Sequence, residues 1–247
     1  MLDFRNSVRL AKAVASLSLV VLMSTVTLAG GVSTGSRVDS SKRPGVLEPV
    51  NLAILIQDDL VSHVSNELNV TRRFIGSLPK GSQVMVGYIT SGSLQVRQPF
   101  TDDLAKASGS LRVLVSSSSA SSFNPYVEVL EALRKFGPHN KNRNVLLLIS
   151  DGLDDSRGID QASVLHSIDL SRAIAEAKRR DVPVYSFYAP SVGLTSRSGL
   201  FAGLGQSSLA RISRETGGKA FFQGIRGFVT FNSYFDGLTR ALNTMES

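Results

Sequence analysis

The sequence contains no cysteine among its 247 residues. This absence excludes disulfide bonds, thiolate metal sites, cysteine catalysis and a lipid-modified N-terminal cysteine, so packing alone must stabilise the fold. Disorder is excluded as the main state, because 42% of the residues are hydrophobic and only 19% are charged. The length suits one full-sized domain with extensions.

Motifs of nucleotide and metal chemistry are also missing. No glycine-rich phosphate-binding pattern follows the first predicted strand, so nucleotide binding is not expected. The three histidines, His63, His139 and His166, lack a metal-ligand spacing such as HExxH, and we interpret them as solvated surface or helix-face residues. The serine-rich stretch 116–122 is interpreted as a flexible loop.

The basic residues exceed the acidic ones without forming one basic face. Lys and Arg number 27 against 20 Asp and Glu, which gives a net charge of +7. Part of this excess precedes an apolar run near the N-terminus, and the rest is scattered as short groups such as Arg72-Arg73. Nucleic-acid binding needs a clustered basic face, so no nucleic-acid partner is expected.

Residues 1–29 have the order of a secretory signal peptide. A basic segment precedes the apolar run Ala13–Met23, and small residues surround Leu28 before a cleavage position after Ala29. The apolar stretch is a little short of the roughly 20 residues that span a bilayer. We therefore predict cleavage, a secreted or periplasmic cell-envelope protein, and no membrane insertion afterwards; retention as an N-terminal membrane anchor is the alternative.

The remaining chain divides into a linker and one domain. Residues 30–49 are rich in Gly, Ser, Lys and Arg, which predicts a flexible linker. Residues 50–247 form the predicted domain. Its fully apolar runs Leu52–Ile56 and Val145–Ile149 are typical of central parallel strands that helices cover on both faces.

Helical and extended patterns alternate through this domain. Further strands are expected over 84–89, 94–100, 182–188 and 219–222, and helices over 61–78, 102–115, 125–136, 169–180, 207–216 and 234–243. The short turn 91–93 favours a hairpin, and 189–205 is expected to be a loop. The predicted fold is α/β: an open, mostly parallel, doubly wound sheet with one antiparallel strand and helices on both faces.

Acidic residues directly follow the two most apolar strands. Asp58 and Asp59 follow the first, and Asp151 follows the second. Ligands of open α/β sheets gather beyond the carboxyl ends of the central strands. We therefore expect these three carboxylates to meet at one edge of the sheet.

Three segments together resemble a von Willebrand factor A-type domain of the secreted bacterial branch. They are the strand ending in Ser150-Asp151-Gly152, the strand Val182–Tyr188, and the segment Leu209–Phe222 with its Glu-Thr-Gly-Gly sequence. The resemblance covers about residues 48–247. It implies the fold described above and a role in protein binding or adhesion.

The resemblance also implies the place of a metal-ion-dependent adhesion site. In that site a DxSxS loop, a threonine and an aspartate hold a divalent cation, usually Mg²⁺. Here the DxSxS positions fall on Gln57, Asp59 and Val61, and only Asp151 matches well. We therefore predict a degenerate site without a cofactor, while a looser Mg²⁺ site would draw its ligands from Asp58, Asp59, Ser122 and Asp151.

The leading interpretation is a non-enzymatic, secreted or envelope-associated adhesion or scaffold module with an unidentified protein partner. One alternative is a metal-dependent adhesion domain with a rearranged cation site, which a cation beside Asp59 and Asp151 would favour. The other is a hydrolase using the acidic cluster, which would need a histidine or lysine nearby. The loop 189–205, with its apolar side chains, either binds a partner or folds back onto the core.

Overall fold

The computed structural model describes residues 48–90, 92–115, 124–137, 141–156, 167–224 and 230–244. The expected signal peptide (1–29), nearly all of the expected linker (30–49) and Ser122 lie outside these ranges, so the statements about them stay predictions. Within the described residues, no helix is long and apolar enough to cross a membrane.

Six strands form one sheet in the order β3-β2-β1-β4-β5-β6. Their bounds are β1 Val50–Gln57, β2 Gln83–Thr90, β3 Ser93–Thr101, β4 Arg143–Ser150, β5 Val184–Tyr188 and β6 Ala220–Phe221. Every neighbouring pair is parallel except β2 and β3, which form the expected hairpin. The predicted fold class is thereby confirmed.

The two apolar runs occupy the centre of the sheet. β1 and β4 are neighbours, with Leu52 beside Val145 and Ile56 beside Ile149. Every residue of β1 is buried. Both faces of these strands are covered, which is why their sequences lack the polar alternation of a half-exposed strand.

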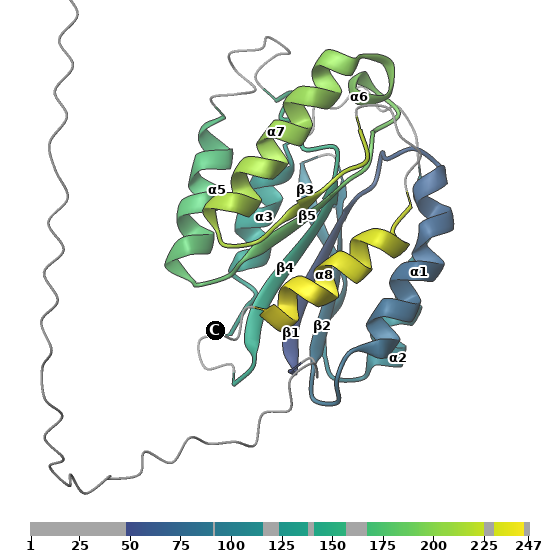
Figure 1. Cartoon of the computed structure of the whole chain (residues 1–247), viewed down its shortest axis with the longest axis vertical. Helices are drawn as coiled ribbons and strands as arrows, with labels where there is room; N and C mark the ends of the chain where they lie inside the picture. Colours follow the sequence, from purple (N-terminus) through teal and green to yellow (C-terminus); the bar gives the residue numbers. More distant parts are fainter. Residues whose placement is uncertain are drawn as a thin grey trace, which may run out of the picture. The chain divides into compact units, whose positions relative to one another are not determined.

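Helices cover the two faces of the sheet in separate groups (Figure 1). One face carries α1 (His63–Ser77), α2 (Leu104–Gly109) and α8 (Asn232–Thr244). The other carries α3 (Pro125–Leu133), α5 (Ile168–Arg179) and α7 (Gly199–Glu215). The short helix α6 (Leu194–Arg197) precedes α7 at the end of the sheet where the parallel strands finish.

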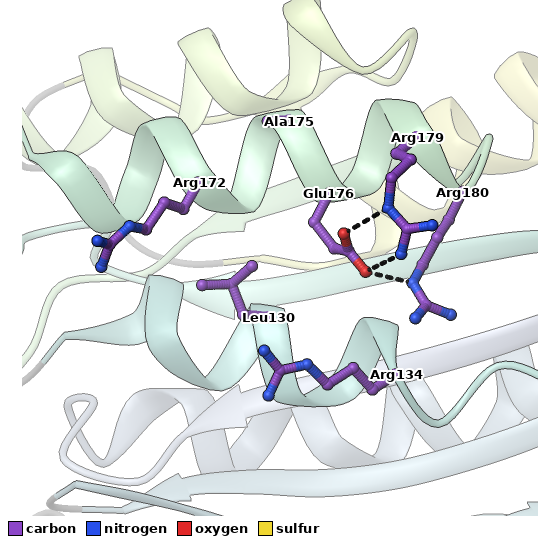
Figure 2. Close-up of a pocket in the computed structure, with 7 residues that line it drawn as sticks. All are labelled: Leu130, Arg134, Arg172, Ala175, Glu176, Arg179 and Arg180. Atoms are coloured by element: carbon purple, nitrogen blue, oxygen red, sulfur yellow. Dashed lines mark hydrogen bonds and ion pairs between the residues drawn. The ribbon is translucent and has the colours of Figure 1, made fainter.

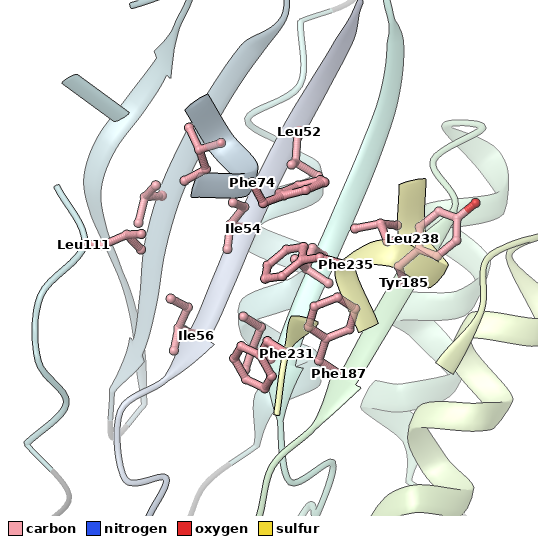
Figure 3. Packing of buried hydrophobic residues seen from close by; sticks show 14 of the residues in the cluster. Leu52, Ile54, Ile56, Phe74, Leu111, Tyr185, Phe187, Phe231, Phe235 and Leu238 are labelled. Carbon is pink, nitrogen blue, oxygen red and sulfur yellow. The ribbon is translucent and has the colours of Figure 1, made fainter. Parts of the chain in front are cut away.

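Aromatic side chains dock α8 onto the sheet. The ring of Phe187, on β5, lies edge-on to Phe235 with centroids 4.9 Å apart, and Phe235 stacks on Phe74 of α1 at 4.3 Å. Figure 3 shows Phe187, Phe231 and Phe235 gathered beside the buried residues of β1. Such pairs add stabilisation beyond the apolar area that they bury.

Two expected elements differ from the structure. The helix expected over 102–115 ends at Gly109, because the Tyr88 Oη accepts a hydrogen bond from the Arg112 backbone at 2.8 Å and holds the following residues in a non-helical path. The segment expected as a loop over 189–205 instead contains α6 and the first turns of α7. In addition, the helix expected from 169 begins at Ile168, with Ser167 as its cap.

Candidate functional site

Gln57, the last residue of β1, is the central residue of a polar cluster at the carboxyl edge of the sheet. Its side chain is almost fully buried. The amide oxygen accepts hydrogen bonds from Ser150 Oγ at 2.6 Å and from the Asp151 backbone N–H at 3.2 Å. The amide nitrogen donates to Asp59 Oδ1 at 2.7 Å. An ionised carboxylate at position 57 has no N–H and could not make this last contact.

The Asp151 carboxylate is buried and hydrogen-bonded at both oxygens. Oδ1 accepts from the Leu153 backbone N–H at 3.0 Å, and Oδ2 accepts from Thr195 Oγ1 at 3.1 Å. Burial raises the pKa of Asp151, and these hydrogen bonds act against that rise. The protein itself therefore supplies the donors that an exposed carboxylate would find in water.

Asp59 lies beside Asp151 and shares Gln57 with it. Burial raises the pKa of Asp59 to about 7, the negative charge of Asp151 adds to the rise, and Asp155 contributes less. The hydrogen bond from Gln57 acts in the opposite direction. The Asp59 carboxyl thus changes its charge near neutral pH.

The segment that follows β5, including α6, brings hydroxyl groups to this cluster. Thr195 Oγ1 accepts from the Ser191 backbone N–H at 2.8 Å and donates to Asp151. Backbone hydrogen bonds join this segment to the loop after β1, from Val61 N–H to the Pro190 carbonyl and from Val192 N–H to the Asp59 carbonyl. Thr195 is therefore held in place by two separate parts of the chain.

Asp58 is engaged elsewhere. Its two oxygens accept from the Arg112 guanidinium at 2.8 and 2.9 Å, a bidentate pair. The guanidinium also lies over the ring of Tyr88, 4.2 Å from its centroid. Asp58 thus fixes the segment after α2 against the sheet.

Close packing fixes the backbone that carries Asp151. Gly152 has a φ of +72°, and a Cβ there would lie 2.4 Å from the Gly205 carbonyl oxygen. A Cβ on Gly205 would lie 2.0 Å from the Asp151 carbonyl oxygen. On the other side of the loop, Tyr126 Oη donates to the Gly152 carbonyl at 2.7 Å. The positions of α3 and α7 therefore determine where the Asp151 carboxylate lies.

Asp154, three residues after Asp151, stabilises the start of α5. Asp154 accepts from the hydroxyls of Ser156 and Ser167, at 2.6 and 2.5 Å. Because Ser167 caps α5, Asp154 fixes the start of that helix.

The structure brings together two of the four candidate ligands, Asp59 and Asp151. Asp58 is paired with Arg112, and Ser122 lies outside the described residues. In the sequence, Gln57 is recognisable only as a departure from DxSxS, and Thr195 was not predicted as a site residue because its segment was expected to be a loop. The available signal was the presence of Ser191 and Thr195 soon after the end of the strand expected over 182–188.

These residues do not fit a cation cage of the DxSxS type. Val61 has no side-chain oxygen, both ends of the Gln57 amide contact the protein, and both oxygens of Asp151 accept hydrogen bonds. Across the described ranges, no group of three or more His, Asp or Glu side chains is arranged to hold a metal ion.

Solved structures with a similar fold are known. BatB from Bacteroides thetaiotaomicron aligns with a TM-score of 0.56 at 16% identity, covering 80% of this chain and 98% of that chain. An aerotolerance-related membrane protein from Bacteroides fragilis aligns with a TM-score of 0.52 at 16% identity, covering 80% and 99%. A von Willebrand factor type A protein from Catenulispora acidiphila aligns with a TM-score of 0.51 at 16% identity, covering 80% and 42%.

The fold is that of a von Willebrand factor A-type domain. At these identities the likeness concerns the fold alone, and the activity must be argued from the site. No protein-family model and no curated protein sequence matches the chain. The von Willebrand factor A-type fold places the Gln57 cluster where the resemblance located the metal site.

Proposed function

We propose that the chain is a non-enzymatic, secreted or envelope-associated protein-binding module, of adhesion or scaffold type, which contacts its partner through the carboxyl edge of the sheet without a bridging cation. The observation that carries the proposal is the Gln57 amide. It links Asp59 to the end of β4 by direct hydrogen bonds, in the place where the resemblance implies a cation.

Apolar side chains near this cluster support a role in protein binding. Val115, whose backbone N–H donates to Asp58, has 64% of its surface exposed, and Leu200 in the first turn of α7 has 57% exposed. Exposed apolar side chains gain free energy when a partner removes them from water, so these two positions favour binding at this edge.

The contacts of the acidic residues speak against the hydrolase alternative. Asp58 is paired with Arg112, and Asp151 is bonded to a threonine hydroxyl and a backbone amide. Neither contact supplies the histidine or lysine that general-base catalysis would use beside such a carboxylate.

Site-specific photo-crosslinking in the native host tests this proposal. A photoreactive residue is placed at Leu200 on the carboxyl edge and, as the matched control, at Lys80 in the turn before β2 on the opposite edge. We expect a crosslinked partner protein from position 200 and none from position 80, with no change when EDTA is present. Equal crosslinking from both positions would contradict the assigned edge. Loss of the crosslink in EDTA would favour the cation-dependent alternative.

A further inference from the structure

An arginine-lined groove lies between α3 and α5, on the face of the sheet opposite α8. Its volume is about 730 Å³. Leu130 and Ala175 are its apolar lining, and the charged lining consists of Glu176 and four arginines, Arg134, Arg172, Arg179 and Arg180. Figure 2 shows Leu130 between the two helices and the arginines around it.

The groove has an excess of positive charge. Glu176 is its one carboxylate, and Arg172 has a second carboxylate, Asp169, beside it at 3.2 Å. Four guanidinium groups therefore face two carboxylates even when Asp169 is counted. Arg134 has no ion-pair partner among the residues that the structure describes, and its side chain is exposed.

Glu176 orients two of the arginines. Its carboxylate accepts from Arg179 at 2.8 and 2.7 Å and from Arg180 Nε at 2.5 Å. These contacts lower the pKa of Glu176 to about 2, so it stays ionised and keeps both guanidinium groups in place. The remaining N–H groups of these arginines are preorganised donors, which lowers the entropic cost of binding an anion.

Helix electrostatics explain only part of the arrangement. Arg134, Arg179 and Arg180 lie at the C-terminal ends of α3 and α5, where the helix dipole favours positive charge. Arg172 lies near the N-terminal end of α5, where the dipole does not favour it. The Asp169 carboxylate, 3.2 Å from Arg172, offsets that unfavourable interaction.

We propose that this groove binds an acidic segment of a partner protein, in which carboxylates alternate with small or apolar side chains. Guanidinium groups bind carboxylates through paired hydrogen bonds, and Leu130 and Ala175 offer contact to the side chains between them. This surface is separate from the carboxyl edge of the proposed function and would add a second point of contact.

The shape and charges of the groove favour this partner over other anions. A bilayer surface is flat and would reach the exposed guanidinium groups without entering the groove. A nucleic-acid backbone is uniformly charged, whereas the groove places the apolar side chains of Leu130 and Ala175 among its guanidinium groups. The chain's own residues 1–47 carry more basic than acidic side chains, so they do not provide such a segment.

Fluorescence anisotropy tests the proposal with a labelled ten-residue peptide of alternating glutamate and alanine, at physiological salt. The test variant is Arg134→Gln with Arg172→Gln, since neither residue contacts Glu176. The control is Arg73→Gln with Arg214→Gln, which removes the same charge from exposed positions of α1 and α7. We expect about a tenfold weaker Kd for the test variant, because hydrogen bonds to charged groups are lost, and less than about a twofold change for the control.

Three outcomes would overturn the proposal. They are no saturable binding of the peptide, equal weakening in both double variants, and equal affinity for a peptide with glutamine in place of glutamate. A preference for phosphatidylglycerol vesicles or for a thymidine oligonucleotide, lost in the test variant alone, would assign the groove to a different partner. The crosslinking from position 200 does not depend on these arginines, so the two proposals can fail separately.

Discussion

At the scale of single residues, Gln57 stands where the DxSxS pattern has a charged aspartate. Its neutral amide both donates and accepts hydrogen bonds. Gln57→Asp removes the hydrogen bond to Asp59 and adds a third carboxylate beside Asp59 and Asp151. We expect the free energy of unfolding to fall by about 1–3 kcal/mol or more at neutral pH, because a buried polar group loses its partner. Urea unfolding measures the loss. Gln95→Asp, on an exposed position of β3, is the control; an equal loss there would contradict a special role for Gln57.

Asp59 is expected to make the stability depend on pH. Its folded-state pKa of about 7 lies above the unfolded value of about 3.9, so the folded protein retains a proton that the unfolded chain releases. The wild-type protein therefore loses stability as the pH rises from about 4 to about 7. Asp59→Asn keeps an acceptor for Gln57 and cannot ionise. In urea unfolding, the free energy of unfolding of this variant relative to wild type should increase from about pH 4 to about pH 7 and stay constant above that range. A pH-independent difference would show that Asp59 does not titrate there.

At the scale of elements, local patterns predicted most of the sheet. The apolar runs of β1 and β4 identified the central strands, and the short turn after β2 identified the hairpin. The lengths of α2 and α7 were not predictable in this way. The residues after Gly109 have apolar side chains that suit a helix, but contacts with Tyr88 and Asp58 hold them in another conformation.

In the candidate site, too, local sequence patterns predicted some features, and contacts between distant residues determine the others. The positions of Asp59 and Asp151 followed from the ends of two strands. The local sequence does not show that Asp59 belongs to the cluster while Asp58 does not. That difference depends on the pairing of Asp58 with Arg112, which lies 54 residues further along the chain. The glycines at the start of α7 favoured a loop over a helix in the sequence. Gly205 is needed because the Asp151 backbone approaches it closely, and no turn requires a glycine there.

The close contact between Gly205 and the Asp151 carbonyl predicts the effect of a substitution in α7. Gly205→Ala would place a Cβ 2.0 Å from the Asp151 carbonyl oxygen, so the helix or the loop must move. We expect a loss of about 1–3 kcal/mol in the free energy of unfolding, as for other overpacked sites. Gly203→Ala in the same helix meets no atom within 4 Å and is expected to stabilise by about 0.5–1 kcal/mol through helix propensity. Equal effects in thermal or urea unfolding would contradict the close contact.

At the scale of the whole molecule, the two proposed surfaces depend on different parts of one framework. The carboxyl edge depends on the ends of β1 and β4, and the arginine groove depends on the spacing of α3 and α5. α5 connects them, because Asp154 of the edge binds the cap of α5 through Ser167. Two contacts on one domain reinforce each other when a single partner reaches both.

Mg²⁺ is expected to leave the stability of the whole domain unchanged. A ligand present at about 100 times its Kd would add about 2.7 kcal/mol to the free energy of unfolding, which a thermal melt resolves. Val61 offers no oxygen and the Gln57 amide is already bonded, so the midpoint in millimolar MgCl₂ should equal that in EDTA. A chain with Gln57→Asp, Asp59→Ser and Val61→Ser restores DxSxS beside Asp151, and we expect it to gain Mg²⁺-dependent stability if Ser122 or a neighbour supplies a hydroxyl. Saturable Mg²⁺ binding to the unmodified protein by calorimetry, lost in Asp151→Ala, would instead establish a rearranged cation site.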